Sequence, residues 1–419
     1  MIGNLVGRAL ELVRREGVRG AVRKVVERRH RFRGLTRHDP LADLGFVNSR
    51  VIEPGSGPGV DLVWFIPPYG RGSGGHTTLF RFVGLLEDRG WTNHICLSGP
   101  GHARNEREAE RQIREWFPPT KAPITLGTNG LPPCRVALAT GWQTAYPVRC
   151  FQGAQTQAYF VQDFEPWFWP AGGASTLAES TYRFGFPAIT MGSWLAGELA
   201  QRYGASTFPL GFSYDRSIFS PRTGQRVGAG RSGDELDRRA GLRVFFYARP
   251  VTPRRGFEIG AMALDALIRQ IPDVTVVTAG WGLGNYTLPF PVEDHGVVTP
   301  EELADVVRGS DVALVLSHSN VSLLPLEIMA CGVPLVTNDE PWSSWLVGPE
   351  VAKLAPSEPD AIAEALVALC RDPAARRGFA QRGAAFAATT SWGAEADRLA
   401  VHLESIAAAA TGAPPTKPV

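Results

Sequence analysis

Three arginines follow one short hydrophobic run in the second half of the chain. Arg249 ends the run VFFYAR, and Arg254 and Arg255 follow within a few residues, directly before Gly256. A guanidinium group carries a permanent charge and donates hydrogen bonds in a fixed planar geometry, so two of them can neutralise a diphosphate together. Arginines at strand ends are also common as plain surface residues. The arginines therefore indicate an anion site only in combination with other features.

A second anion-binding feature lies in the run SNVSLLPLEIMACGVPLV. Pro325 suits the first turn of a helix, where its missing N–H is not needed. The backbone amides of Ser322, Leu323 and Leu324 would then point beyond the helix start, where unpaired donors and the helix dipole favour an anion. Glu327 lies in the first turn and could accept hydrogen bonds from sugar hydroxyls. The alternative is that Glu327 only complements the helix dipole.

A third feature is the loop of Gly296, Val297 and Val298, which precedes another helical pattern. Thr299 or Pro300 begins this helix, and two glutamates follow in its first turn, as the helix dipole prefers. Main-chain groups of such a loop can read the edge of a nucleobase. The three features occur in the order that a sugar-nucleotide site would use.

The first half of the chain contributes a glycine-rich loop, PYGRGSGGH, after a hydrophobic run. Gly70, Gly72 and Gly75 satisfy the G-x-G-x-x-G pattern. A dinucleotide site also needs an acid at the end of the next strand, and that strand reads ICLSGPGH without a carboxylate. We therefore expect no NAD site here. Gly74 and Gly75 are small residues that let backbone amides approach a ligand closely.

An aromatic segment, YFVQDFEPWFWP at 159–170, is the main candidate for binding an acceptor, the molecule that would receive a sugar from a sugar nucleotide. Pro166 and Pro170 make a long buried strand unfavourable, and apolar sugar faces stack on aromatic rings, although the run can also be plain core. The candidate acceptor-side residues are His76, Trp142, Asp163, Glu165 and Trp167, and the first, third and fourth are also the candidate proton acceptors.

Composition places the chain among ordinary globular proteins. It has 419 residues, 44% of them hydrophobic, and a net charge of +2, which gives no indication of nucleic acid binding. Its five scattered cysteines form no C-x-x-C pair and fit a reducing compartment. The chain shows no run of apolar residues long enough to span a membrane. These features predict a cytoplasmic protein.

The N-terminal segment is more basic than the rest. Residues 1–40 carry eleven Lys or Arg against four acids, with apolar residues at helical spacing. A basic amphipathic helix can lie on an anionic membrane surface, which would place the protein at the inner face of the membrane. It can equally pack on the domain with a solvated basic face.

Short apolar runs alternate with helical patterns from residue 60 onward, which is typical of a parallel α/β sheet. The alternation stops where Gly, Arg and Ser accumulate and then restarts, so we expect two Rossmann-like domains facing each other across a cleft. The predicted segments are a basic amphipathic segment (1–40), a first domain (41–215), a linker or insertion (216–242), a second domain (243–388), a C-terminal helix (389–409) and a flexible tail (410–419).

Together these residues resemble the retaining glycosyltransferases of family 4, which share the two-domain GT-B fold. The resemblance covers roughly residues 60 to 400 and is most specific in the second half. That family places an arginine, and five positions later a lysine, on the diphosphate. Arg249 and Arg254 match this pair by spacing, and Arg255 is the alternative because it directly precedes a glycine.

Two further elements carry the resemblance, and one position departs from it. Gly74 and Gly75 match the Gly-Gly loop of the family, and ACGVP at 330–334 matches its A-x-G-x-P segment. The family has two glutamates eight positions apart ahead of that segment. Glu327 matches the second, whereas Ser319 occupies the position of the first. The first glutamate is usually placed near the donor sugar.

A rhamnosyltransferase branch looks similar in this departure, in the aromatic segment and in the TGWQTAY turn at 140–146. The resemblance thus implies a nucleotide-sugar donor, for which it suggests dTDP-rhamnose. It also implies a glycan or lipid-linked acceptor in cell-surface polysaccharide synthesis. It places the donor on the second domain and the acceptor on the first, with the C-terminal helix crossing back to the first domain.

The chain has no D-x-D sequence of the kind that often holds a mobile metal, so we expect a metal-independent enzyme without a cofactor. Arg249, Arg254 and the helix amides would supply the positive potential, and in a retaining mechanism the leaving phosphate can itself take the acceptor's proton. The alternatives are a sugar-nucleotide epimerase or hydrolase on the same fold, or a catalytically degenerate binding homologue.

Overall fold

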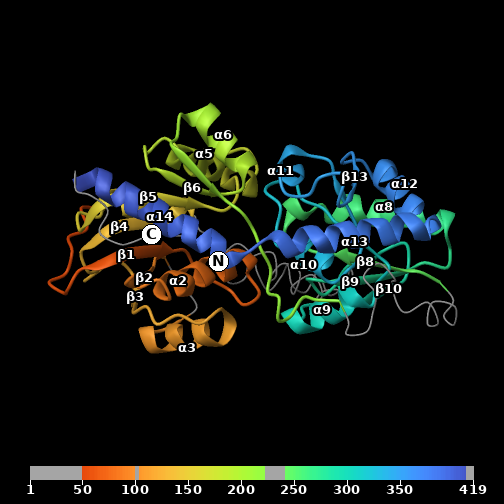
Figure 1. The fold of residues 1–419 in the computed structure, drawn as a ribbon, viewed down its shortest axis with the longest axis horizontal. Coiled ribbons are helices and arrows are strands. Elements are labelled where there is room, and N and C mark those ends of the chain that lie inside the picture. The colour runs from red at the N-terminus through yellow and green to blue at the C-terminus, as the bar shows by residue number, and fades with distance from the viewer. Residues whose placement is uncertain (1–49, 100–102, 222–240, 412–419) are drawn as a thin grey trace, which may run out of the picture. The chain divides into compact units, whose positions relative to one another are not determined.

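The computed structural model describes residues 50–99, 103–221 and 241–411. The predicted basic segment at 1–40, most of the predicted linker at 216–242 and the tail from residue 412 lie outside these ranges. Within them, the strands form two separate parallel sheets, one built from each half of the chain (Figure 1).

The first sheet has the strand order β3-β2-β1-β4-β5-β6-β7, and all its pairings are parallel. Its strands are β1 (Val60–Ile66), β2 (Asn93–Leu97), β3 (Ile124–Leu126), β4 (Cys134–Ala139), β5 (Ala154–Val161), β6 (Ala188–Met191) and β7 (Thr207–Leu210). The accompanying helices are α2 (Gly74–Glu87), α3 (Glu106–Trp116), α4 (Trp142–Cys150), α5 (Gly173–Thr181) and α6 (Ser193–Tyr203), with a short 3-10 turn, η2 (Glu165–Phe168).

The second sheet has the order β10-β9-β8-β11-β12-β13, again with parallel pairings. Its strands are β8 (Arg243–Tyr247), β9 (Thr275–Ala279), β10 (Val292–Asp294), β11 (Val312–Val315), β12 (Leu335–Asn338) and β13 (Lys353–Ala355). The helices are α8 (Phe257–Gln270), α9 (Pro300–Arg308), α10 (Leu324–Ala330), α11 (Pro341–Ser344), α12 (Pro359–Arg371), α13 (Pro373–Thr389) and α14 (Trp392–Thr411), with the 3-10 turn η3 (Pro253–Arg255).

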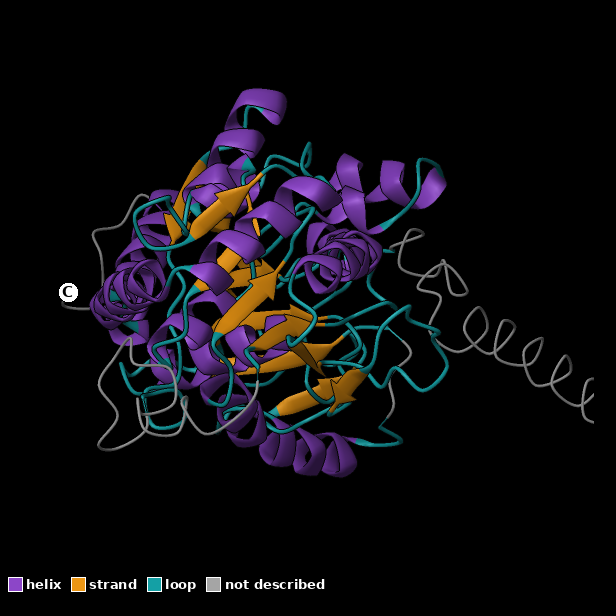
Figure 2. Cartoon of the chain, turned by 90° about the vertical axis from the view of Figure 1, so that its right-hand side faces the viewer, coloured by secondary structure: helices purple, strands orange, loops and turns teal. Residues whose placement is uncertain are grey.

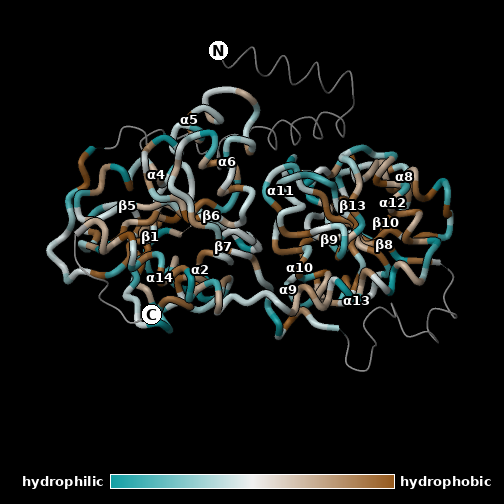
Figure 3. The backbone as a smooth tube through the Cα atoms, turned by 45° about the horizontal axis from the view of Figure 1, so that its top comes forward, coloured by the Kyte–Doolittle hydropathy of each residue, from teal (hydrophilic) through white to brown (hydrophobic). Residues whose placement is uncertain are grey.

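Both sheets are covered by helices on their two faces, as parallel sheets require (Figure 2). The central strands are therefore apolar throughout: Leu62 to Ile66 of β1 have no exposed surface. Hydrophobic segments follow the strands, and hydrophilic segments lie mostly on the outer helices and loops (Figure 3). The two-domain α/β fold expected from the sequence is confirmed.

Local sequence signals set several element boundaries. Thr299 caps α9, because its hydroxyl accepts from the Glu302 amide at 3.2 Å and the Glu302 carboxylate accepts from the Thr299 amide at 2.8 Å. This reciprocal pair satisfies two amides that lack partners within the helix. Pro300 occupies the first helical position, as its fixed φ favours. The predicted start of this helix is confirmed.

Helix α14 crosses back to the first domain, as expected. It packs against α2, β4, β5 and β7. Arg135 of β4 binds Glu404 of this helix through two hydrogen bonds of 2.9 and 2.6 Å, and also contacts Asp61 of β1 at 3.3 Å. Because Glu404 is only 4% exposed, this bidentate pair fixes where the end of the chain docks.

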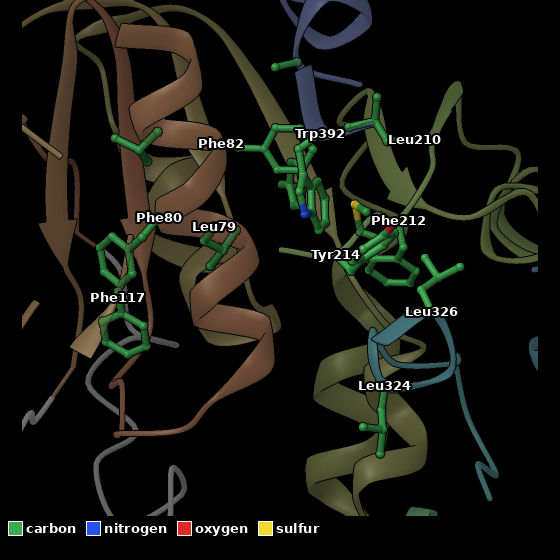
Figure 4. Close-up of a cluster of buried hydrophobic side chains, with 14 of the residues drawn as sticks. Leu79, Phe80, Phe82, Phe117, Leu210, Phe212, Tyr214, Leu324, Leu326 and Trp392 are labelled. Carbon is green, nitrogen blue, oxygen red and sulfur yellow. The ribbon is translucent and has the colours of Figure 1, made fainter. Parts of the chain in front are cut away.

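One apolar cluster contains residues of the segment after β7, of the start of α14 and of helix α10. Trp392 lies edge-on to Phe82 of α2, with ring centroids 5.6 Å apart. Phe212 and Tyr214, which follow β7, lie between this pair and Leu326 of α10 (Figure 4). The same apolar cluster therefore includes residues of both domains.

Glu404→Gln tests the docking of α14. The change removes the charge that Arg135 pairs with at a buried site, so we expect a loss of about 1–3 kcal/mol in the free energy of unfolding. Asp397→Asn on the same helix is the matched control: Asp397 pairs with Arg89 at 2.7 Å but is 68% exposed, so its loss stays below about 1 kcal/mol. Urea unfolding measures both, and equal effects would contradict the buried role of Glu404.

Candidate functional site

The three arginines predicted at the site lie together after β8. Arg255 donates from Nη1 to the Ser317 hydroxyl at 2.8 Å and to the Asn320 carbonyl at 3.4 Å. Burial lowers the pKa of Arg255 to about 10, and the nearby charges of Arg254 and Arg249 act in the same direction. A guanidinium with this pKa remains charged at neutral pH. The cluster thus concentrates positive charge at the carboxyl end of the sheet, where α/β folds bind ligands.

Arg249 and Arg254 each have N–H groups that their hydrogen bonds within the chain do not use. Arg249 donates from Nη1 to the Tyr247 hydroxyl at 3.3 Å, while its buried Nε has no acceptor among the described residues. Arg254 stacks over the Phe168 ring at 4.0 Å, and its Nε lies 3.4 Å from Asp163. Three guanidiniums with one close carboxylate leave an excess of positive charge, which suits an anion such as a diphosphate.

The start of α10 adds unpaired donors. Leu323 is the N-cap of α10. The first amide hydrogen bonds of the helix run from Leu326 and Glu327 to the Leu323 carbonyl. The amides of Ser322, Leu323 and Leu324 have no acceptor within the described part of the chain. The geometry expected from Pro325 at the second helical position is therefore present.

Asn320 joins the two domains immediately before this helix. Its side-chain amide donates to the Gln162 carbonyl at 2.8 Å and the Met191 carbonyl at 2.6 Å, both at strand ends of the first sheet. Its side-chain oxygen accepts from the Trp345 indole at 2.8 Å, and its backbone amide donates to Asp163 at 2.8 Å. The residue is 1% exposed, so it forms a fully bonded junction between the sheets.

Asp163, one of the predicted proton acceptors, is part of this junction. Its Oδ1 accepts from the amides of Phe164 and Asn320, each at 2.8 Å, and its Oδ2 accepts from the Ser319 hydroxyl at 3.1 Å. Arg254 lies on the same oxygen. Both oxygens of Asp163 are thus occupied by hydrogen-bond donors of the junction. The structure therefore gives Asp163 a positioning role in place of the proton-accepting role.

Glu165, the second predicted acceptor, caps a helix. Its Oε2 accepts from the Trp142 amide at 2.6 Å, at the start of α4, and its Oε1 accepts from the Tyr159 hydroxyl at 3.3 Å. The side chain is 6% exposed, and this burial raises the pKa of Glu165 to about 8 while the Trp142 amide lowers it. The sequence-based interpretation of Glu165 as an acceptor-side group is corrected to a structural one.

The aromatic segment divides into core and surface. Trp142 is 1% exposed and packs on Tyr146 and Trp169, so it does not offer a stacking face to an acceptor. Trp167 and Phe168 are 41% and 36% exposed. Trp142 is therefore a core residue, whereas Trp167 keeps an accessible ring.

The glycine loop begins α2. Gly74 and Gly75 are its first two residues, with Ser73 as cap. A Cβ on Gly74 would meet nothing within 4 Å, whereas one on Gly75 would touch Gln162, the neighbour of the domain junction. His76 contacts the Ser73 hydroxyl through Nδ1 at 2.7 Å, and burial lowers its pKa to about 4. His76 is therefore neutral at physiological pH.

The remaining predicted donor residues lie at the ends of β10 and in α10. Asp294 holds the loop of Gly296, Val297 and Val298 by accepting from the Gly296 amide at 3.0 Å, and Val297 is 70% exposed. Glu327 is half-buried; burial raises its pKa to about 7, and the nearby Arg81 lowers it. Of the predicted donor residues, Gly74 and Gly75 thus lie in the first domain and the others in the second.

Sequence reasoning missed the residues that support the arginines. Ser317, Asn320 and Tyr247 each bind an arginine or join the domains, yet they have ordinary types and no spacing that marks them. The signal available was position alone, because all three follow or end a strand next to a predicted site residue. Within the described ranges, no cluster of three or more His, Cys, Asp or Glu could hold a metal ion, and no helix is long and apolar enough to cross a membrane.

Two sequence comparisons show which known proteins the chain is similar to. Residues 242–367 match the model of the WsaF C-terminal domain. O-antigen biosynthesis protein RfbC of Myxococcus xanthus is 33% identical over 347 residues, which cover 80% of this chain and 26% of RfbC, so the chain spans only about a quarter of that relative.

Two solved structures are similar in fold. Anabaena HepE, determined in complex with UDP, has a TM-score of 0.62 at 16% identity, covering 82% of this chain and 100% of HepE. WaaG, a glycosyltransferase involved in lipopolysaccharide biosynthesis, has a TM-score of 0.56 at 10% identity, covering 82% of this chain and 99% of WaaG. The chain has the GT-B fold. The fold expected from the sequence resemblance is confirmed.

Glu165→Gln should change how stability depends on pH. The buried carboxyl keeps its proton up to about pH 8 in the folded chain but loses it near 4.5 when unfolded, so it makes the wild type less stable as the pH rises through this window. Glutamine keeps an acceptor for the Trp142 amide and cannot ionise. Relative to wild type, the variant should gain more than about 1.4 kcal/mol, the value of one pKa unit, between about pH 5 and about pH 8.

Urea unfolding at the two pH values measures this difference. Glu115→Gln, at an exposed position of α3, is the control and should shift stability equally at both. A pH-independent difference for Glu165→Gln would show that Glu165 is ionised in the folded chain.

Proposed function

We propose that the chain is a glycosyltransferase that moves a sugar from a nucleotide-sugar donor onto a glycan or lipid-linked acceptor in cell-surface polysaccharide synthesis. The observation that carries the proposal is the anion site, in which Arg249, Arg254 and Arg255 lie together with part of their donor capacity unused. The unpaired amides at the start of α10 add to it. The names of RfbC and WaaG, which concern O-antigen and lipopolysaccharide synthesis, support the same class of product.

The proposed chemistry is electrostatic. Departure of the nucleoside diphosphate places negative charge on its phosphates and positive charge on the sugar ring, and fixed guanidiniums and amides stabilise the first of these. Because these groups supply the positive potential, the proposal is a metal-independent transfer. Glu327 would grip the donor hydroxyls from the first turn of α10 and so orient the anomeric carbon.

We propose that the transfer retains the anomeric configuration, and the hydrogen bonds of two carboxylates support this. Asp163 has donors on both oxygens, and Glu165 caps α4, so neither is available as the base for an acceptor hydroxyl. The departing phosphate can then take that proton on the face it leaves. The bond from the anomeric carbon to phosphate breaks, the bond to the acceptor oxygen forms on the same side, and the nucleoside diphosphate leaves protonated.

The donor that we favour is dTDP-rhamnose. Support comes from Ser319, a hydroxyl where the related enzymes have a glutamate near the donor sugar, and from the aromatic segment after β5. The deoxy sugar rhamnose offers fewer hydroxyls to such a glutamate. We place the reaction at the cytoplasmic face of the membrane, with residues 1–40 as a basic contact to anionic lipid.

A transfer assay tests the function. The purified chain is incubated with labelled dTDP-rhamnose and a lipid-linked oligosaccharide acceptor, with and without EDTA, and products are separated by mass spectrometry. We expect labelled acceptor in both conditions. Arg249→Ala should weaken binding of dTDP at least about tenfold by calorimetry, the scale of a lost charge-assisted hydrogen bond. Arg269→Ala, an exposed arginine of α8, is the matched control.

Other outcomes would select the rival functions. Turnover of the nucleotide sugar without acceptor indicates an epimerase or hydrolase, and tight binding with no turnover of any donor indicates a degenerate homologue. Loss of transfer in EDTA, with recovery in magnesium or manganese, would contradict metal independence. Unchanged nucleotide affinity in a folded Arg249→Ala variant would remove Arg249 from the site.

Glu327→Gln separates a donor-binding glutamate from one that only begins a helix. The ionised carboxylate strengthens bonds to sugar hydroxyls, so kcat/KM of the wild type should rise with pH through about 7, the pKa that burial gives this group. The variant should lose this limb and at least about tenfold in kcat/KM, near 1.4 kcal/mol in the barrier, with little change in Tm. Full activity and an unchanged pH profile in the variant would leave Glu327 as a helix-start residue only.

A further inference from the structure

Trp281 is an exposed aromatic residue at the carboxyl end of β9. Its side chain is 37% exposed. Within the described residues its ring does not stack on another aromatic ring. A large aromatic face open at the ligand-binding edge of a parallel sheet is a candidate contact for a ligand.

The backbone places Trp281 beside the arginine cluster. The preceding Gly280 has φ +112°, and a Cβ there would lie 2.7 Å from the Tyr247 ring and 3.1 Å from the Ala248 carbonyl. Only glycine fits this approach. Tyr247 in turn accepts the hydrogen bond from Arg249, so a chain of direct contacts runs from Trp281 through Gly280 and Tyr247 to a guanidinium of the anion site.

The same turn is fixed to the loop predicted to read the nucleobase. The Gly280 amide donates to the Gly296 carbonyl at 2.8 Å, and Gly296 lies against Gly282. Asp294 ties the two loops together, because its Oδ1 accepts from the Gly296 amide at 3.0 Å and its Oδ2 from the Leu283 amide at 2.7 Å. The turn is thus held rigidly, which an aromatic platform requires.

We propose that Trp281 stacks on the nucleobase of the donor, with its diphosphate on Arg249 and its neighbours. The inference rests on the proposed function, since it assumes a nucleoside diphosphate at the anion site. Stacking depends on the π-face that every base has, so Trp281 provides affinity for the nucleoside but little choice between bases. Choice between bases then falls to main-chain groups of the Gly296–Val298 loop.

Calorimetric titration of three ligands against matched variants tests the assignment. The ligands are dTDP, UDP and inorganic pyrophosphate, and the variants are Trp281→Ala, Trp281→Phe, Arg249→Ala and the control Met262→Ala, which truncates a 60% exposed side chain of α8 in the same domain. Circular dichroism and Tm confirm that each variant is folded.

We expect Trp281→Ala to weaken dTDP and UDP about tenfold each, as loss of one stacked base does, and to leave pyrophosphate unchanged. Trp281→Phe, which keeps an aromatic face, should recover most of the affinity. Arg249→Ala should weaken all three ligands, and Met262→Ala none.

The two proposals fail in different ways. If Arg249→Ala weakens all three ligands and Trp281→Ala weakens none, the anion site stands and the stacking role is overturned. If Trp281→Ala weakens pyrophosphate as much as dTDP, the side chain supports the loop rather than the base, and the assignment is again overturned. If wild-type chain binds none of the ligands, the proposed function itself fails.

Discussion

The side chain of Asn320 is the contact on which the arrangement of the two domains depends. Its amide nitrogen binds two carbonyls at strand ends of the first sheet, those of Gln162 and Met191, while its oxygen accepts from Trp345. Asn320 itself is 1% exposed, so leaving its polar groups unpaired is costly. The segments that follow β5, β6 and β11 are therefore held together. Asp163 strengthens the same contact by accepting the Asn320 backbone amide.

Contacts with this junction position site residues that lie in loops of ordinary composition. Arg255 binds Ser317 and the Asn320 carbonyl, so its guanidinium is positioned by the segment that joins the domains. The close approach of Trp345 to Gly192, where a Cβ would meet the indole at 2.4 Å, depends on a glycine with φ +100° at the end of β6. A rigid junction thus fixes the arginines relative to the first domain.

Sequence patterns were sufficient for elements whose signals are local. The start of α9 at Thr299, the strand before Arg249 and the helix containing Glu327 all follow from capping residues, apolar runs or a proline position. The roles of Asp163 and Glu165 were not predictable in this way, because their partners lie on other elements: a loop of the opposite domain for the first, and the start of α4 for the second. The sequence alone does not distinguish a free carboxylate from one that is buried and fully hydrogen-bonded.

Ser319 illustrates how a contact from the other domain limits which residue fits at one position. Its hydroxyl donates to Asp163 Oδ2 at 3.1 Å, so a carboxylate from the first domain already occupies the neighbourhood of this position. A glutamate at 319 would place a second negative charge against Asp163 in a buried setting, and like charges so close cannot both remain ionised. A small donor is the residue that the junction tolerates. The serine at position 319 is therefore compatible with the interdomain role of Asp163.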